Sequence, residues 1–149
     1  MENNNRWIIY PSISHNYNYF GGELVNITDK NVTVLVPHKL QKYYKNNNNC
    51  KKAVVLKCKC LLLKDEFTYN DVVSWYKPYL KEHIKLYSGT EMYFFTSDGI
   101  PMIGRVTNQT TYGVTLQVQI EQFGISRTFT IKREYNQIIP IGMIDSYFY

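Results

Sequence analysis

Alanine is almost absent from this sequence of 149 residues, in which Ala53 is the only one. Alanine is the strongest helix former, whereas Tyr, Ile, Val, Thr and Phe pack well on the pleated surface of a sheet. The sequence contains 14 Tyr, and its hydrophobic content of 44% is ordinary for a folded globule. The composition therefore predicts a folded, mainly β protein.

The sequence also lacks a long apolar run. No stretch approaches the roughly 20 apolar residues that cross a bilayer, and the polar start Met1–Asn5 does not fit a signal peptide. We expect an intracellular protein of the cytoplasm or nucleus that does not enter a membrane. Asn, Lys, Ile and Tyr have AT-rich codons, and their abundance is typical of AT-rich genomes such as those of many viruses, so a virus-infected cell is also considered.

Catalytic motifs are missing as well. There is no Gly-x-Ser-x-Gly, no P-loop and no Gly-x-Gly-x-x-Gly, and no motif pairs His15, His38 or His83 with a nucleophile. We therefore expect a protein that is not an enzyme, with no catalytic residues and no cofactor.

Only three cysteines are present, an odd number that does not suggest a disulfide scaffold. Cys50, Cys58, Cys60 and His38 form the one candidate ligand set. In structural zinc sites the paired ligands are usually two to four residues apart, but one residue separates Cys58 from Cys60. We expect no metal, and we expect both thiols of this pair to point into the core as small hydrophobes.

The basic charge is concentrated in one segment. The nine lysines from Lys30 to Lys64 have no Asp or Glu among them, whereas the rest of the chain carries eight basic and twelve acidic residues. Such segregation attracts an acidic partner, either nucleic acid or an acidic face of a protein. A solvated, lysine-rich loop without a partner is the alternative.

Period-two alternation and turn residues predict most of the strands. Residues 23–28 and 32–36 read as a hairpin, and residues 53–63 as one strand with Leu56, Cys58, Cys60 and Leu62 on the same face. In the second half the strands are expected at 92–96, 100–107, 114–120, 127–132 and 139–144, with Phe129 and Ile131 facing inward.

One helix is expected between the two groups of strands. Thr68 and Asp71 fit a capping box, and Phe67 and Val72 fit the hydrophobic staple that accompanies it. Pro78 predicts either a kink or two short helices.

Two segments align without gaps, GELVNITDKNVTVLV at 22–36 and GRVTNQTTYGVTLQV at 104–118. This pattern resembles the second and third strands of SH3-like small barrels, with Tudor-like and Sm-like domains as the nearest families. The resemblance implies two tandem small-barrel binding modules joined by the helical segment. The expected units are a first barrel at 1–64, a helical linker at 65–88 and a second barrel at 89–149.

The leading functional hypothesis is a nucleic-acid-binding protein, with RNA favoured because exposed aromatics stack on unpaired bases. Cations supply the path for a phosphate backbone, and tyrosines supply flat surfaces. The predicted binding residues are Lys39, Lys42, Tyr43, Tyr44, Lys45, Lys51, Lys52, Lys57 and Lys59.

Two other binding roles remain open. The Tudor-like resemblance implies an aromatic cage that holds a methylated cation against ring faces, as in a reader of peptides or a viral adaptor of a host protein. The cage candidates are Tyr17, Tyr19, Phe20, Tyr93, Phe95 and Tyr112, all of which could instead fill the core. The third possibility is a structural subunit that associates with itself.

Overall fold

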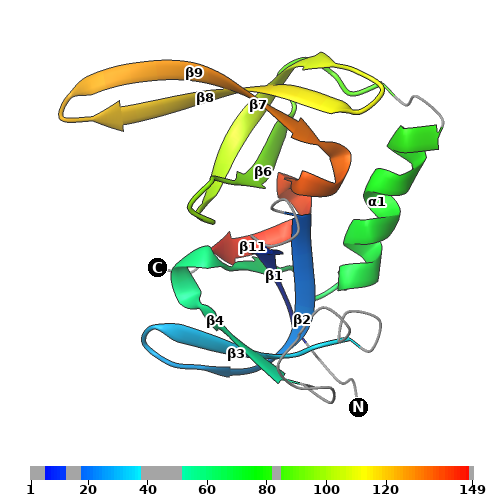
Figure 1. Cartoon of the computed structure of the whole chain (residues 1–149), viewed down its shortest axis with the longest axis vertical. Helices are drawn as coiled ribbons and strands as arrows, with labels where there is room; N and C mark the ends of the chain where they lie inside the picture. Colours follow the sequence, from blue (N-terminus) through cyan, green and yellow to red (C-terminus); the bar gives the residue numbers. More distant parts are fainter. Residues whose placement is uncertain (1–5, 13–17, 38–51, 82–84, 148–149) are drawn as a thin grey trace.

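The computed structural model is mainly β, with two antiparallel sheets and one long helix (Figure 1). It describes residues 6–12, 18–37, 52–81 and 85–147. The composition-based prediction of a mainly β protein is therefore confirmed. Within the described residues no helix has the length and apolarity needed to cross a membrane.

The first sheet has six strands in the order β11-β5-β1-β2-β3-β4. The bounds of the first five in chain order are β1 (Trp7–Ser12), β2 (Asn18–Ile27), β3 (Asn31–Leu35), β4 (Lys52–Leu56) and β5 (Leu61–Leu63). The sixth is the C-terminal strand β11 (Ile144–Tyr147). A short 3-10 helix, η3 (Lys57–Lys59), lies between β4 and β5.

The second sheet has five strands in the order β10-β6-β7-β8-β9. Its elements are β6 (Glu91–Phe95), β7 (Pro101–Gln109), β8 (Gly113–Gln122), β9 (Ile125–Glu134) and β10 (Ile138–Pro140). The 3-10 helix η4 (Tyr135–Gln137) precedes β10, and η5 (Ile141–Met143) leads into β11. Neither sheet closes into a barrel.

The aligned segments adopt the same local structure in both sheets. Leu24 pairs with Val34 and Val106 pairs with Leu116, and the register then shifts by one residue at the same aligned position. In the turns that follow, Thr28 and Thr110 make the same bonds, because each backbone N–H donates to the carbonyl of the residue three positions on, at 2.9 and 2.8 Å. The internal repeat is therefore a repeat of structure, including its bulge and its turn.

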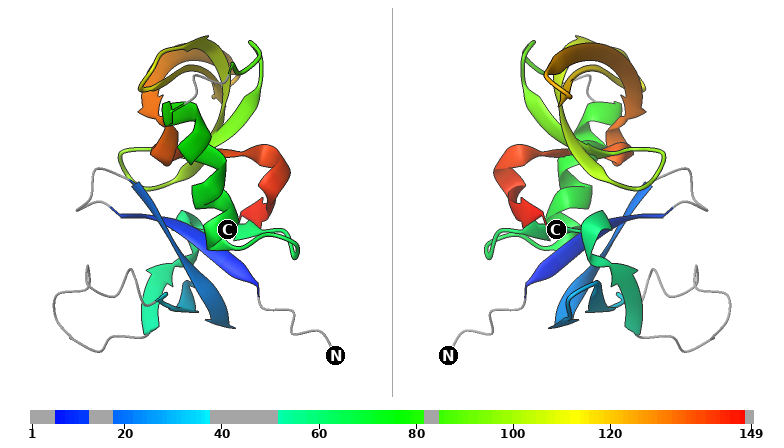
Figure 2. Two further views of the ribbon diagram at one scale, coloured as in Figure 1. Left: turned by 90° about the vertical axis from the view of Figure 1, so that its right-hand side faces the viewer. Right: turned by 90° about the vertical axis from the view of Figure 1, so that its left-hand side faces the viewer.

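The helix α1 (Tyr69–Lys81) runs beside both sheets (Figure 2). The predicted capping box is present, since Thr68 N donates to Asp71 Oδ2 at 2.8 Å and Asp71 N donates to Thr68 Oγ1 at 3.4 Å. Pro78 lies within one continuous helix, so the alternative of two short helices was wrong. The helix packs Val72 into the first core and Tyr79 against the second.

Strand β6 contributes to two cores at once. Met92 and Phe94 belong to the core of the second sheet, whereas Tyr93 and Phe95, on the opposite face, belong to the core of the first. This follows from the alternation of side chains along a strand. The two sheets therefore share buried side chains.

The C-terminal strand ties the sheets together a second time. Although it follows the second sheet in sequence, β11 pairs with β5 of the first, and Ile144 is buried there. Arg6 reinforces this contact, because Nη2 lies 2.7 Å from Asp145 Oδ2. The proposed unit 89–149 therefore contributes a strand to the sheet of unit 1–64.

The prediction of one strand over residues 53–63 was wrong. The chain leaves β4 at Leu56, turns through η3 and returns as β5, which pairs with β1. The turn changes which residues face inward, so that Leu61 and Leu63 are fully buried and Leu62 is not. A straight strand would have continued beside β3 and could not have reached β1 on the other side of the sheet.

Two further inward assignments need correction. Cys60 is buried as expected, but Cys58 is exposed on η3, because the 3-10 turn ends the two-residue alternation. Ile131 packs against the second core, whereas Phe129 is 39% exposed, since it lies further along β9 where the sheet narrows to two strands.

Candidate functional site

The predicted nucleic-acid residues fall into two groups. Lys52, Lys57 and Lys59 lie in the described part of the chain, on β4 and η3. The others, which are Lys39, Lys42, Tyr43, Tyr44, Lys45 and Lys51, lie outside the described residues. The strands on either side of that second group, β3 and β4, are hydrogen-bonded neighbours with Leu35 opposite Lys52. Leu35 and Lys52, which lie on either side of this second group in the sequence, are therefore side by side at one end of the strand pair.

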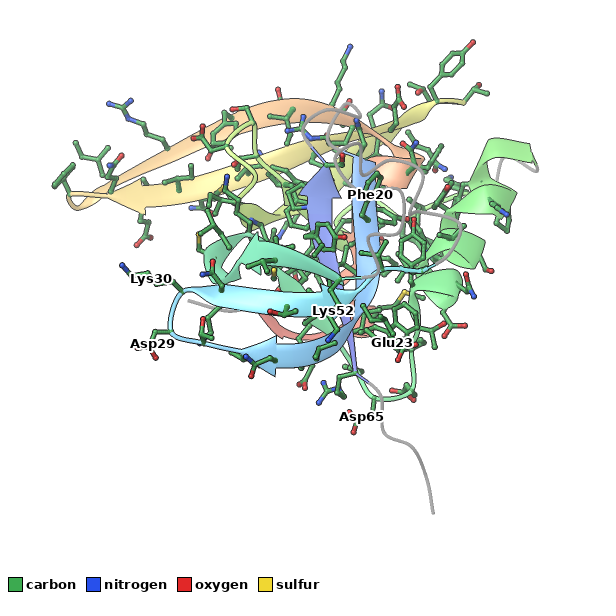
Figure 3. The ribbon with its side chains drawn as sticks, turned by 60° about the horizontal axis from the view of Figure 1, so that its bottom comes forward. Phe20, Glu23, Asp29, Lys30, Lys52 and Asp65 are labelled. Atoms are coloured by element: carbon green, nitrogen blue, oxygen red, sulfur yellow. The ribbon has the colours of Figure 1, made fainter. Side chains whose placement is uncertain are left out.

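The other end of the same strand pair is also basic. Lys57 N donates a hydrogen bond to Lys30 O at 2.8 Å, which brings η3 against the β2–β3 turn. Figure 3 shows Lys30 on this turn and Lys52 further along the β3–β4 pair. Asp29 adjoins Lys30, so the turn carries one negative charge as well.

Lys59 extends this basic region toward the second sheet. A Cβ on Gly99, in the β6–β7 turn, would lie 3.2 Å from Lys59 Cδ, so the aliphatic part of the lysine rests on that turn. Lys30 and Lys59 make no ion pair with any other residue that the structure describes.

Apolar side chains lie between the two basic ends. Val54 is 67% exposed and Leu56 is 48% exposed on β4, the last strand of the sheet. The described residues of β3, β4 and η3 therefore form a candidate site with lysines at its two ends and exposed apolar side chains between them.

The aromatic cage candidates are mostly core residues. Tyr19, Phe20, Tyr93 and Phe95 are all less than one-tenth exposed and belong to the first core. Tyr19 packs edge-on against Tyr69 and Tyr76 of α1, and burial raises the pKa of its phenol well above the usual range. All four rings are packed within the first core and leave no open cage between them.

The two remaining cage candidates are not brought together with the others. Tyr112 is 78% exposed in the β7–β8 turn, and Tyr17 lies outside the described residues. Four of the six cage candidates therefore fill the core, which is the alternative role that the sequence left open for them.

Metal ligands do not gather among the described residues, where no group of three or more His, Cys, Asp or Glu could hold an ion. Burial raises the pKa of the Cys60 thiol to about 12, which keeps it protonated and unreactive. His38 and Cys50 lie outside the described residues.

A hydrogen-bonded cluster near the β7–β8 turn was not predicted from the sequence. Gln109 Oε1 accepts from Leu86 N at 2.7 Å and its Nε2 donates to Tyr135 Oη at 2.8 Å, while Tyr135 Oη donates to Thr110 O at 2.8 Å. The cluster borders a hollow of about 570 Å³, and a second hollow of about 400 Å³ adjoins it. Gln109 aligns with Ile27 of the first repeat, and this polar replacement was the available signal.

No protein-family model matches the chain, and neither the curated proteins nor the solved structures contain a match to it.

Proposed function

We propose that this chain is a non-enzymatic binding protein made of two SH3-like small-barrel units, and that the first unit binds nucleic acid. The resemblance is supported by the order of the elements. In both sheets four strands follow in sequence, a 3-10 helix comes next, and a short strand then pairs beside the first strand. Such modules present loops and edges rather than catalytic groups.

The observation that carries the binding proposal is the segregation of lysine. Nine lysines without an acidic residue occupy 30–64, and among the described ones Lys52 lies at one end of the β3–β4 pair while Lys30 and Lys57 lie at the other. A row of cations of this kind neutralises phosphates and releases their counterions. RNA is favoured because Tyr43 and Tyr44 stand among these lysines in the sequence and would stack on unpaired bases.

A titration of fluorescently labelled single-stranded RNA at several salt concentrations tests this proposal. The variant changes Lys39, Lys42, Lys45 and Lys51 to Gln. Each phosphate contact contributes about 0.7 to the slope of log affinity against log salt for a single strand, so we expect the slope to fall by about 3. The affinity at low salt should fall by more than about tenfold.

A matched control removes four positive charges elsewhere, by changing Lys77, Lys85, Arg105 and Lys132 to Gln. This control should retain most of the affinity, because those residues lie on α1 and the second sheet or beside them. Absent binding, binding that ignores salt, or equal losses in both variants would contradict the proposal.

The peptide-reader and adaptor alternatives have less support, because four of the six cage residues are buried. An array of methylated peptides, probed with the wild type and with Tyr17→Ala and Tyr112→Ala, distinguishes them from RNA binding. Peptide binding that depends on these two tyrosines, without RNA binding, would favour the reader.

A further inference from the structure

Strands β8 and β9 continue beyond the rest of the second sheet as a two-stranded arm (Figure 1). Strand β7 pairs with β8 only as far as Gln117, whereas β8 and β9 remain paired to Gln122 and Ile125. No third strand of the described chain therefore pairs with the distal half of the arm.

The tip of the arm holds an aromatic side chain in an unfavourable backbone conformation. Phe123 is 93% exposed and has φ 54°, and it is the only non-glycine residue with positive φ in the part of the chain described. With Gly124 at φ 74° it forms a two-residue turn in which Asn-Gly is strongly preferred. A bulky side chain in this conformation is strained, and such strain concentrates where a residue serves a contact.

One long edge of the arm is not paired with any other described strand. Strand β9 is the last strand of its sheet, and its ten residues pair only with β8. The residues that flank a two-residue turn form a hydrogen-bonded pair, so Ile125 and every second residue after it bond to β8. The backbone groups of Ser126, Thr128, Thr130 and Lys132 therefore point to the open edge.

We propose that a second copy of this chain pairs antiparallel with β9 along this edge, with Phe129 opposite Phe129 of the second copy. A two-fold axis perpendicular to the sheet keeps the apolar faces of both arms on the same side. This register sets Thr128 against Thr130 and Ser126 against Lys132. Shifting the register so that Thr130 faces itself would set Arg127 against Arg133, which opposes like charges.

The same register gives the exposed tip a place to bind. Antiparallel pairing about a two-fold axis sets the tip of each arm beside the base of the other, so that Phe123 reaches the level of Tyr135 in the second copy. The hollow of about 400 Å³ lies at that level and is lined by Tyr112, Val114 and Arg133, among others. In the same register Phe129, which is 39% exposed on the apolar face of the arm, would pack beside Phe129 of the second copy.

The charges of the arm favour a protein partner over nucleic acid or an anionic membrane. Between Val118 and Thr130 the arm has one acidic residue, Glu121, and one basic residue, Arg127, so its net charge is zero. Phosphate-bearing partners require an excess of cations. An arm with no net charge, an apolar face and an open edge instead matches another copy of itself.

The test measures the molar mass of the full chain by light scattering and sedimentation over a wide range of protein concentration. Thr130→Pro removes an N–H that points only to the open edge, so the single chain keeps its β8–β9 bonds. Because the two copies are related by a two-fold axis, each dimer loses two of these hydrogen bonds. We therefore expect the dissociation constant of the dimer to rise at least about tenfold.

Phe123→Asn gives a second and independent readout. Asn suits the left-handed turn, so this change should raise the melting temperature of the monomer while it weakens the dimer. A variant that is more stable as a monomer but dimerises more weakly has lost a contact between the two copies, whereas a variant with a damaged fold would also be less stable.

Val54→Pro is the matched control, since it changes the edge of the other sheet. Val54 also points its backbone N–H to an edge with which no described strand pairs, because Val32 and Val34 on either side of Thr33 bond to β4. This variant should dimerise as the wild type does. A chain that stays monomeric at every concentration, or a dimer that Val54→Pro disrupts and Thr130→Pro does not, would overturn the proposal.

Discussion

Phe95→Ala tests whether the two sheets unfold as one unit. Phe95 belongs to β6 of the second sheet, yet it is 2% exposed and lies in the core of the first. Removing a fully buried phenylalanine side chain costs about 3–5 kcal/mol, from lost transfer energy and the cavity that remains. A mutation in the second sheet should therefore destabilise the first directly.

The sequence supplies a separate fluorescent reporter for each core. Trp7 packs against the first core and Trp75 against the second. Two backgrounds, Trp75→Phe and Trp7→Phe, leave one tryptophan each and allow urea unfolding of the two cores to be followed separately. With a slope of about 2 kcal/mol per molar urea, a loss of about 4 kcal/mol lowers the midpoint by about 2 M.

We expect both reporters to give one midpoint before the substitution and one lower midpoint after it. The shared strand β6, the helix α1 and the returning strand β11 couple the two cores, so neither can unfold alone at low cost. Ile103→Ala is the control, because Ile103 is 40% exposed on β7 and should shift the midpoint little. Two separate transitions, with only the Trp7 transition shifted by Phe95→Ala, would refute this coupling.

Two other predictions concern the repeat and the buried thiol. Gly22→Ala should lower the free energy of unfolding by about 3 kcal/mol and Gly104→Ala should lower it by about 1 kcal/mol, as measured by thermal unfolding. The reason is that an added Cβ would lie 2.8 Å from Val34 Cβ at Gly22 but 3.0 Å from Leu116 Cβ at Gly104, and equal costs would contradict it. Burial raises the pKa of the Cys60 thiol from 9.0 to about 12, so its stabilising effect is complete below pH 9 and is lost as the pH rises toward 12. Urea midpoints across this window should fall less in Cys60→Ala than in the wild type, and parallel curves would count against the assignment.

Local signals predicted the local structure well. The capping box at Thr68 and Asp71 was found from residue types and spacing, because both partners lie within one turn of the chain. The two hairpins that carry the repeat were found from β-branched residues and turn residues, which also act over a few positions. Sequence patterns are informative at this range because the interactions they encode are local.

Long-range features were not predicted, for physical reasons. The return of β11 to the first sheet pairs Ile144 with Leu63, and no local pattern specifies a partner so far away in the chain. The turn within residues 53–63 was not predicted, because Lys57, Cys58 and Lys59 continue the alternation of polar and apolar residues in the sequence. In the structure the chain turns there and brings β5 beside β1. The concentration of lysine at 30–64 could be seen in the sequence. The pairing of β3 with β4, which places Lys52 at one end of the strand pair and Lys30 and Lys57 at the other, could not.

The two halves of the repeat preserve their buried positions and differ on their surfaces. Val32 and Val114 are both buried, and so are Val34 and Leu116. The adjacent turn carries Lys30 in the first repeat and the exposed Tyr112 in the second, and opposite Thr33 and Thr115 stand the exposed apolar Val54 and the exposed Lys132.

Shared packing explains why these differences are confined to the outside. Because β6 supplies side chains to both cores, a change in buried volume in either half disturbs both, whereas an exposed turn or edge can change without that cost. The first half thereby carries a basic surface and the second an arm with no net charge. This separation predicts that the proposed RNA binding is equally strong in Thr130→Pro and in the wild type, because the described lysines of 30–64 lie on or beside the first sheet and the arm belongs to the second.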